Sequence, residues 1–360
     1  VTEKVGGFGV VGVLNSGKQA KGGVVLYRAD LDALPITEST GLTYASKRAG
    51  VMHACGHDLH MAIAVATLKL LRSRDQHWAG TVVFVGQPAE EVGRGARAML
   101  ADSAFRKILA RTGTPRLALA LHDTSDFAAG DFSLVPGWHT ANVDSVDIVV
   151  HGKGGHDSRP HESVDPIVIA SELVLSLQTI VARRVAPGER AVVTVGSFTA
   201  GTKHNIIPPT ATLLITVRSY GDTMRAFLLA EIARVAKSIA AAHNAPKPPD
   251  VIVRDEFTPA GYNDPAWTEK LRELFARHFG AEHVHGGEPW TGGEDFGLLA
   301  RELAVPGVLV RLGAADPSKL AAKIEVPGTH SDKFAPAARP ALEAGARAMA
   351  LAIEAALAGP

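Results

Sequence analysis

A single cysteine, Cys55, occurs in the whole chain of 360 residues. One thiol excludes an intrachain disulfide, so we expect it to be reduced, buried or bound to a metal. The chain also lacks an excess of charge of either sign, because Lys and Arg together number 37 and so do Asp and Glu. The sequence contains no basic stripe that would indicate nucleic-acid binding and no acidic block that would indicate a solvating tail.

No apolar run is long enough to span a membrane. The longest, residues 61–71, is interrupted by Thr67 and Lys69 and predicts a buried helix. We therefore expect a soluble protein without a nucleic-acid or membrane partner. The cytoplasm is favoured, but the chain starts at Val1 rather than at a methionine. A processed or omitted N-terminal segment, and with it a periplasmic or secreted location, stays open.

Length and pattern predict two domains. The chain is long for a single core, and 46% of its residues are hydrophobic. The first 140 residues alternate between strand-like and helix-like segments, which predicts a sheet covered by helices. From residue 141 the order becomes β-α-β-β-α-β, a self-contained two-layer arrangement. We predict a discontinuous domain of residues 1–140 and 256–360, with residues 141–255 inserted into it.

The expected elements follow from turn residues, caps and periodicity. The strands are residues 8–14, 24–28, 81–86, 117–121, 143–150, 191–198, 211–219 and 251–254, with a turn at 15–18. The helices are residues 61–71, 95–102 and 340–357, one that Asp165 caps and one that Asp222 caps.

Residues 53–58, with the sequence HACGHD, carry the strongest chemical signal. Cys55 lies two positions from His57, and a thiolate and an imidazole this close can share one borderline-soft metal ion. The next residue, Asp58, has a carboxylate that can bind a second ion or orient the first. The segment therefore predicts a metal site.

Other ligand-type side chains follow predicted strands. Glu90 and Glu91 come just after one strand, His122 directly after another, and Asp30 and Asp32 after a third. Ligands of open α/β sheets gather outside the carboxyl ends of the strands, so we expect these side chains to converge. Asp30 is also compatible with a simple turn, and we do not count it as a ligand.

Two adjacent carboxylates at positions 90 and 91 indicate a division of labour. One can hold metal while the other takes a proton from a water whose pKa the divalent cation lowers. Each signal taken alone has a simpler interpretation: a solvated glutamate pair, a buried hydrophobic or nucleophilic Cys55, and strand-end or loop histidines at His122 and His330.

The predicted inserted domain has polar side chains of its own. Three glycines in residues 152–155 let the backbone bend sharply and expose His156. The amide of Asn205 and the guanidinium of Arg218 suit a substrate oxyanion and carboxylate. The simpler alternatives are a turn cap for His156 and Asn205 and a surface ion pair for Arg218.

Five motifs occur in order along the chain: HACGHD at 53–58, QPAEE at 87–91, GGH at 154–156 with PH at 160–161, NIIP at 205–208 and EDF at 294–296. Together they resemble the di-metal aminoacylase/carboxypeptidase family, in the branch of hippurate hydrolase, auxin-conjugate amidohydrolases and bacterial N-acyl-amino-acid amidohydrolases. The resemblance runs from about Phe8 to His330. It implies a zinc-peptidase-like catalytic domain, with a mixed sheet flanked by helices, and an inserted βαββαβ dimerisation domain.

The resemblance also implies roles for single residues. Two divalent ions, zinc, manganese, cobalt or nickel, would be held by the residues that match the family's ligands, Cys55, His57, Glu91, His122 and His330. Glu90 matches the general base, and Asp32 matches an aspartate beside the metals. His156 matches a histidine that stabilises the oxyanion across a dimer, and Asn205 and Arg218 match substrate contacts.

The implied function is hydrolysis of the amide bond of a small N-acyl-amino acid by a homodimer. A dipeptidase or carboxypeptidase on the same scaffold is the alternative. A metal-stabilised binding protein without turnover is a further one, against which the spare carboxylate of Glu90 argues. The sequence departs from the family pattern at Asp123 and Thr124, which follow His122, and at Asp157, which follows His156. The resemblance implies that these positions lie near the substrate, so the departures concern substrate specificity more than the chemistry. The acyl group, the amino acid and the native metal stay open.

Overall fold

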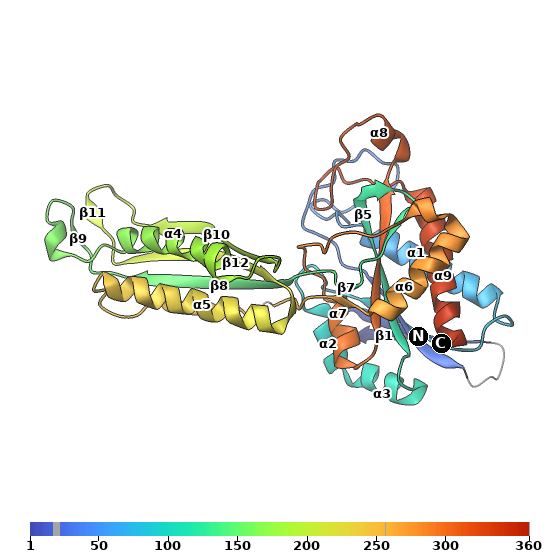
Figure 1. Cartoon of the computed structure of the whole chain (residues 1–360). Helices are drawn as coiled ribbons and strands as arrows, with labels where there is room; N and C mark the ends of the chain where they lie inside the picture. The colour runs from blue at the N-terminus through green and yellow to red at the C-terminus, as the bar shows by residue number, and fades with distance from the viewer. Residues whose placement is uncertain (17–21, 256, 360) are drawn as a thin grey trace. The chain divides into compact units, whose positions relative to one another are not determined.

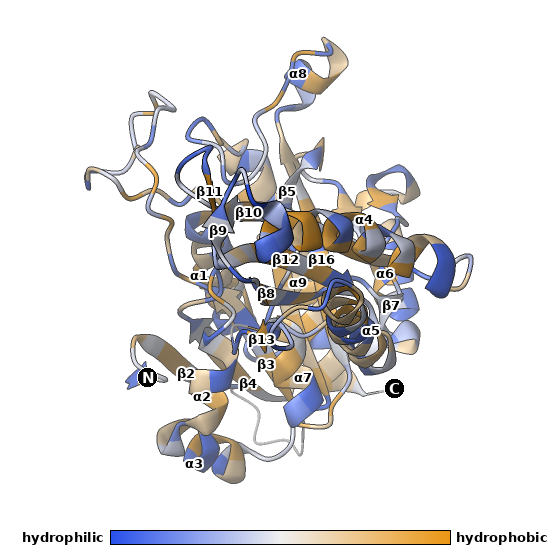
Figure 2. Cartoon of the chain, turned by 90° about the vertical axis from the view of Figure 1, so that its left-hand side faces the viewer, coloured by the Kyte–Doolittle hydropathy of each residue, from blue (hydrophilic) through white to orange (hydrophobic). Residues whose placement is uncertain are grey.

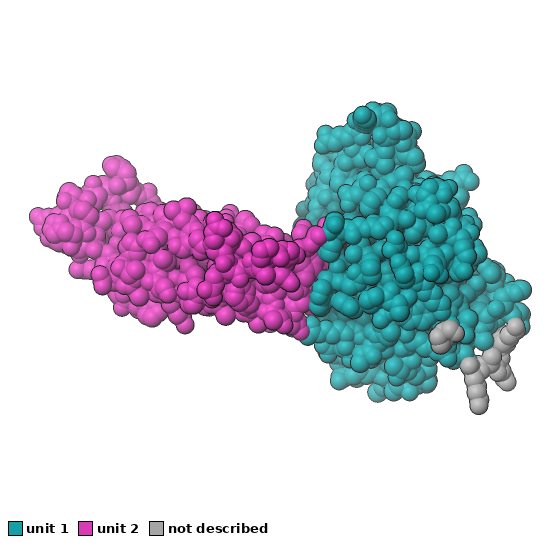
Figure 3. Space-filling model, in the orientation of Figure 1, with its two compact units in different colours: residues 1–139, 261–289, 294–360 teal, residues 140–260, 290–293 magenta. Residues whose placement is uncertain are grey.

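The computed structural model describes residues 1–16, 22–255 and 257–359, and it divides into two compact units (Figure 3). Unit 1 comprises Val1–His139, Gly261–Pro289 and Glu294–Pro360, and unit 2 comprises Thr140–Ala260 and Trp290–Gly293. The predicted turn at 15–18 lies partly outside the described residues.

Unit 1 is built on an eight-stranded mixed sheet with the order β1-β2-β4-β3-β5-β16-β6-β15. The neighbours β4, β3, β5 and β16 run parallel, whereas β2 is antiparallel to both β1 and β4. The strands are β1 (Thr2–Val5), β2 (Gly9–Asn15), β3 (Gly23–Asp30), β4 (Gly80–Gln87), β5 (Leu117–Ala128), β6 (Phe132–Ser133), β15 (Val284–His285) and β16 (Gly307–Ala315). All eight residues of β3 are buried, as expected of a central parallel strand covered on both faces.

Helices cover both faces of this sheet (Figure 1). The first face carries α1 (His57–Ser73), α6 (Pro265–Phe279) and α9 (Ala338–Ala358). The second carries α2 (Gly95–Ala101), α3 (Ser103–Thr112) and α7 (Phe296–Glu302). Alternate residues of β3 separate the two cores, because Val25 and Tyr27 pack with α1 and α9 whereas Val24 and Leu26 pack with the second set. The predicted fold class, an α/β protein with a mixed sheet flanked by helices, is confirmed.

Unit 2 contains a four-stranded antiparallel sheet with the order β10-β12-β8-β13. Its elements are β8 (Asn142–His151), β9 (Gly155–His156), α4 (Pro166–Arg184), β10 (Ala191–Ala200), β11 (Ile206–Ile207), β12 (Thr210–Ser219), α5 (Gly221–Ala242) and β13 (Asp250–Val253). Every second residue of β12, among them Leu213 and Ile215, is buried against α4 and α5. In Figure 2, hydrophobic and hydrophilic residues alternate around α4, as they do in a helix with one face on a sheet.

Two predictions about helices are wrong in detail. Residues 61–71 form part of α1, but this helix is not buried on all sides, because Val65 is 53% exposed. Asp222 lies in the first turn of α5, whose N-cap is Tyr220.

The sequence analysis also overlooked α4 as an apolar segment. Its 19 residues are long and apolar enough, by length and composition alone, to cross a membrane. In unit 2 the side chains of Ile169, Leu173 and Leu177 instead pack on the sheet, as in the core helix of a globular domain.

Candidate metal centre

The carboxyl ends of three neighbouring parallel strands bring the predicted ligands of unit 1 together. Asp30 ends β3, with Asp32 two residues further on, and Glu90 and Glu91 follow β4. His122 lies within β5 rather than after it, because this strand continues to Ala128. The strand order β4-β3-β5 places the three ends side by side, which is where α/β sheets bind their ligands.

Cys55 and His57 enter the same place from the start of α1. Gly56 between them has a φ of +76°, in the left-handed region that favours glycine. A Cβ atom at this position would lie 2.4 Å from the carboxylate oxygens of Asp123. Gly56 therefore allows the tight turn that presents the thiol and the imidazole on either side of it.

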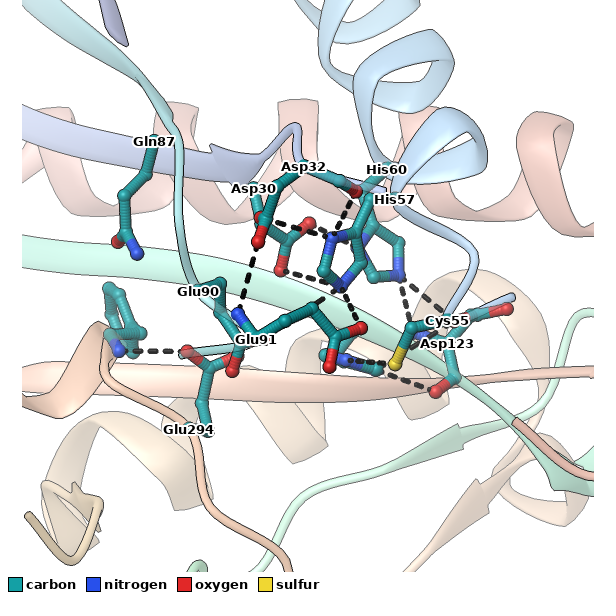
Figure 4. A network of polar contacts seen from close by, with 12 residues as sticks. Asp30, Asp32, Cys55, His57, His60, Gln87, Glu90, Glu91, Asp123 and Glu294 are labelled. Carbon is teal, nitrogen blue, oxygen red and sulfur yellow. Dashed lines mark hydrogen bonds and ion pairs between the residues drawn. The ribbon is translucent and has the colours of Figure 1, made fainter. Parts of the chain in front are cut away.

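The distances between ligand atoms are short (Figure 4). Cys55 Sγ lies 3.7 Å from His122 Nε2. His57 Nε2 lies 3.9 Å from Oε1 of Glu91 and also 3.9 Å from Oε2 of Glu90. Glu91 belongs to two groups whose ligand atoms all lie within 4.8 Å of one another, one with Cys55 and His330 and one with His57 and Glu90. The structure thus brings together six residues that the sequence analysis singled out.

His330 reaches this centre from a loop. Its Nε2 lies 3.3 Å from Oε2 of Glu91, and its side chain is 56% exposed. Its backbone has a φ of +67°, and its N–H donates to the carbonyl oxygen of Ala54 at 2.7 Å. That bond ties the loop to the segment that carries Cys55, which explains how a residue far along the sequence arrives here.

Hydrogen bonds orient the two buried imidazoles. His57 Nδ1 donates to the backbone oxygen of Asp32 at 3.0 Å, which turns Nε2 toward Glu90 and Glu91. His122 Nδ1 donates to the backbone oxygen of Asp123 at 2.8 Å, and its Nε2 faces Cys55. Such bonds on the second ring nitrogen are how metal-binding histidines are held in place.

Burial and charge shift the acid–base properties of the centre. Burial, followed by the positive charge of His60, lowers the pKa of His122 to about 4. Its imidazole is therefore neutral near pH 7, the form that binds a metal. Burial, followed by the carboxylates of Glu91 and Glu90, raises the pKa of the Cys55 thiol. Burial, followed by the neighbouring carboxylates of Glu294 and Asp295, also raises the pKa of Glu90.

His60 lies buried between two carboxylates of the centre. Burial alone would lower its pKa, but the carboxylates of Asp30 and Asp123 raise it to about 10. Its Nδ1 lies 2.5 Å from Asp30 Oδ1, and its Nε2 lies 3.0 Å from Asp123 Oδ1. His60 therefore bridges and positions two carboxylates of the centre.

Arg28 is a buried cation beside the centre, and the sequence analysis overlooked it. Its guanidinium donates to Asp30 Oδ2 at 2.7 Å, to Glu294 Oε1 at 2.8 Å and to Gln87 Oε1 at 3.0 Å. Asp295 Oδ1 lies 3.3 Å away. The carboxylates of Glu294 and Asp295 also group with that of Glu90. An arginine within the otherwise apolar segment 24–28 was the signal that something buried and anionic faces it.

The residues present fit a divalent cation. Four of the seven buried side-chain atoms that lack a hydrogen-bond partner among the described residues lie at this centre: Asp32 Oδ1, His57 Nε2, Glu91 Oε1 and Asp123 Oδ2. Buried polar atoms without a partner are costly, and carboxylates crowded around a thiol repel one another. Imidazole, thiolate and carboxylate donors are those that zinc and its first-row neighbours take.

The remaining predicted site residues lie in unit 2. His156 belongs to β9, which pairs with β11, and its side chain is 67% exposed. Asn205 directly precedes β11. Arg218 lies near the opposite end of β12 from Thr210, eight positions or about 26 Å of strand away. The strands β9 and β11 lie beyond the end of β12 that carries Thr210 (Figure 1). Within a single copy of unit 2, His156 and Arg218 are therefore at opposite ends of the sheet.

Comparisons with known proteins agree with this geometry. The family model described as Peptidase family M20/M25/M40 matches residues 26–355. N-acetylcysteine deacetylase of Bacillus subtilis (strain 168) is 38% identical over 297 residues, which are 81% of this chain and 73% of the relative. N-acetyldiaminopimelate deacetylase of Streptococcus pneumoniae serotype 19F (strain G54) is 38% identical over 298 residues, 82% of this chain and 75% of the relative.

Two solved structures resemble the whole chain. A putative aminohydrolase from methicillin resistant Staphylococcus aureus matches with a TM-score of 0.84 and 33% identity over 99% of this chain and 87% of its own. A Bacillus subtilis protein described as a dinuclear metal binding peptidase of the M20 family matches with a TM-score of 0.80 and 30% identity over 98% and 86%. The family resemblance predicted from the five motifs is confirmed, and the chain belongs to peptidase family M20/M25/M40.

Proposed function

We propose that this chain is a metal-dependent amidohydrolase that cleaves the amide bond of N-acyl-amino acids. The observation that carries the proposal is the spare carboxylate of Glu90, which lies 3.9 Å from His57 Nε2 beside a complete set of metal-type ligands. A structural metal site has no use for such a group, whereas a hydrolytic site needs a general base. Relatives named as deacetylases of N-acetylcysteine and N-acetyldiaminopimelate support the substrate class.

The residues that would hold two divalent ions are Cys55, His57, Glu91, His122 and His330. Asp32 would support them, because its backbone oxygen orients His57 and its Oδ2 accepts from the N–H of Glu91 at 3.1 Å. When bound, the ions would polarise the amide carbonyl and lower the pKa of a nearby water. Zinc, manganese, cobalt and nickel all suit this donor set.

Glu90 would move the proton. Its carboxylate accepts one proton from water as the water oxygen attacks the amide carbon, and it passes that proton to the nitrogen of the leaving amine. The C–N bond then breaks to give the free acid and the amino acid. The Arg28 guanidinium beside Glu294 and Asp295 would keep these neighbouring carboxylates in place around Glu90.

Unit 2 would supply the remaining groups. The imidazole of His156 would donate to the tetrahedral oxyanion, and Asn205 and Arg218 would hold the substrate carboxylate. His156 and Arg218 lie at opposite ends of one sheet, so a single small substrate cannot contact both within one copy of unit 2. We therefore propose that residues 141–255 are a dimerisation domain and that the partner copy provides one of the two ends.

Surface features of unit 2 support a second copy as the partner. Strand β10 lies at the edge of the sheet, where its outer N–H and C=O groups can pair with another strand. On α4, Ile167, Val168 and Leu175 are exposed, the last by 72%. An open strand edge with nearby apolar side chains is typical of a two-fold interface.

The test of the proposed function is Glu90→Gln with matched measurements of turnover and bound metal. We expect kcat to fall by about two to four orders of magnitude while the metal content stays that of the wild type. Glu302→Gln, an exposed glutamate on α7, is the control. Near-normal turnover of Glu90→Gln would show that the base is another group.

A substrate panel separates the alternatives. N-acyl-amino acids and dipeptides are offered to the metal-loaded wild type, and preferential hydrolysis of dipeptides would favour a peptidase. Bound metal without hydrolysis of any amide would identify a binding protein and overturn the proposal.

A further inference from the structure

Unit 1 contains a cavity of about 400 Å³ that is separate from the metal centre. It lies between the first two turns of α1, the first turns of α9 and the loops before α1 and α9. Among the described residues, its lining includes none of the six side chains that the metal centre brings together. Cavities of this size are typical of sites for small organic molecules.

Apolar and aromatic side chains form most of the wall. Leu42, Met52, Leu59 and Leu342 contribute aliphatic surface, and Phe334 contributes a buried ring. Tyr44 lies at the exposed edge. Such a wall can bind the apolar body of a small molecule, and an aromatic ring attracts a cation that lies over its face.

The titratable side chains in the lining, besides Tyr44, are the two carboxylates of Glu38 and Asp58 and the imidazole of His53. Glu38 accepts hydrogen bonds from the Thr40 hydroxyl and from the N–H of Ser46 at 2.8 Å. Asp58 Oδ1 accepts from the N–H of Leu59 at 3.0 Å. These donors are neutral, and within the described part of the chain neither carboxylate pairs with a lysine or arginine. The Glu38 carboxylate is therefore held in position, the Asp58 carboxylate is exposed to solvent, and neither is paired with a lysine or arginine that the structure describes.

We propose that this cavity binds a small organic ammonium ion with an apolar body. The carboxylates attract the ammonium group, the rings add a cation–π attraction, and the aliphatic wall takes the hydrocarbon part. The same carboxylates disfavour an anion of equal size, and a neutral isostere lacks the charge-assisted hydrogen bonds.

The cavity adjoins the turn that carries two of the candidate metal ligands. Met52, Asp58 and Leu59 face the cavity, while Cys55 and His57 from the same segment face the metal centre. An occupant would contact the backbone that positions these ligands. It would be either the amino-bearing part of a substrate or product, or a separate effector amine.

The direct test is calorimetric titration of the metal-loaded full chain with phenethylamine. Phenethyl alcohol and hydrocinnamate serve as neutral and anionic isosteres of the same body. We expect the amine to bind, the alcohol to bind at least about fivefold more weakly, and the acid not to bind. Glu38→Gln and Asp58→Asn should each weaken amine binding by about three- to fivefold. The control is Glu343→Gln, because Glu343 lies on α9 outside the lining and pairs with Arg339.

A blocking variant shows that the amine occupies this cavity rather than the metal centre. Ala62→Phe places a ring inside the lined space, and circular dichroism and thermal unfolding verify its fold. Loss of amine binding in folded Ala62→Phe supports the proposal. Unchanged amine binding in all three cavity variants, or equal binding of the alcohol, overturns it.

Kinetics then assign the source of the amine. Competitive inhibition of N-acyl-amino-acid hydrolysis indicates a substrate or product group, and a change of kcat without competition indicates an effector. Because the titration needs no turnover, its failure is distinguishable from failure of the proposed hydrolase function.

Discussion

Arg28 is the residue whose removal should disturb the molecule most. Its guanidinium is fully buried and contacts Asp30, Glu294 and Asp295, each within 3.3 Å. Removing one partner of a buried ion pair leaves the other charges without compensation, whereas an exposed pair contributes little. We expect Arg28→Met to lower the free energy of unfolding by about 3–5 kcal/mol, measured by denaturant unfolding of the metal-loaded protein.

Arg339→Met is the matched control for this substitution. Arg339 forms an exposed pair with Glu343 four positions along α9, so its loss should change stability by less than about 0.5 kcal/mol. An Arg28→Met protein as stable as the wild type would mean that the surrounding carboxylates are protonated or otherwise neutralised.

His139 should make unit 1 sensitive to acid. The residue is buried, and burial followed by the charge of Arg311 lowers its pKa to about 3. In the unfolded chain a histidine titrates near 6.5, so below that pH the unfolded state binds a proton that the native state does not. The contribution of His139 to the free energy of unfolding is constant above about pH 6.5. It becomes unfavourable as the pH falls toward 3, by at most about 1.4 kcal/mol per pH unit.

His139→Gln removes this proton uptake. We expect the loss of stability between pH 7 and 5 to be smaller in the variant than in the wild type by about 1–2 kcal/mol, measured by urea unfolding at both values. His161→Gln, at an exposed histidine of unit 2, should leave the pH dependence as it is. Identical pH dependence of His139→Gln and wild type would show that His139 is solvated in the native state.

Single residues differ in how much of their role the sequence reveals. Cys55 and His57 at a helix start and Glu91 after a strand are unusual residue types at the carboxyl edge of the sheet, and their convergence follows from the rule for α/β sheets, whereas His122 reaches the centre from within β5. His330 has no such mark, because a loop and a bond to the Ala54 backbone place it. The charge partners Arg28 and His60 cannot be assigned from sequence, since their roles depend on which carboxylates tertiary packing brings beside them.

At the scale of elements, α4 shows how local sequence sets a helix boundary. Asp165 is the N-cap, with its Oδ1 accepting from the N–H of Ile167 at 2.8 Å, and Pro166 follows at the first helical position. We expect Asp165→Ala to lower the free energy of unfolding by about 1 kcal/mol in denaturant unfolding. Asp165→Asn keeps the acceptor and should restore most of it. Equal losses in both variants would assign the effect to the charge rather than to the cap.

The longer elements are predictable because their signals are local. The strand–helix alternation of β3, α1 and β4, and the cap of α4, are written in periodicity and turn residues. Two-residue strands such as β9 and β15 carry no periodicity, and only tertiary pairing defines them. The error about α1 has the same cause, because composition cannot show which side of an apolar helix the sheet leaves uncovered.

At the scale of the whole molecule, we propose an active site to which two chains contribute. The metal centre lies in unit 1, and one copy of unit 2 holds His156 and Arg218 at opposite ends of its sheet. If His156 serves the site of the partner, a chain that lacks it can still offer an intact metal centre, and a chain that lacks Glu90 can still offer His156. Two inactive chains should then complement each other in a mixed dimer.

Co-expression of His156→Ala and Glu90→Gln chains with different affinity tags tests this arrangement. In the purified mixed dimer one of the two sites combines Glu90 of one chain with His156 of the other, so we expect about half of the wild-type turnover per dimer. Each variant alone, and a mixed-tag dimer of two Glu90→Gln chains, should stay near background. If His156 acted in its own chain, every site of the mixed dimer would lack either Glu90 or His156. A mixed dimer whose turnover stays at background would therefore show that His156 acts in its own chain.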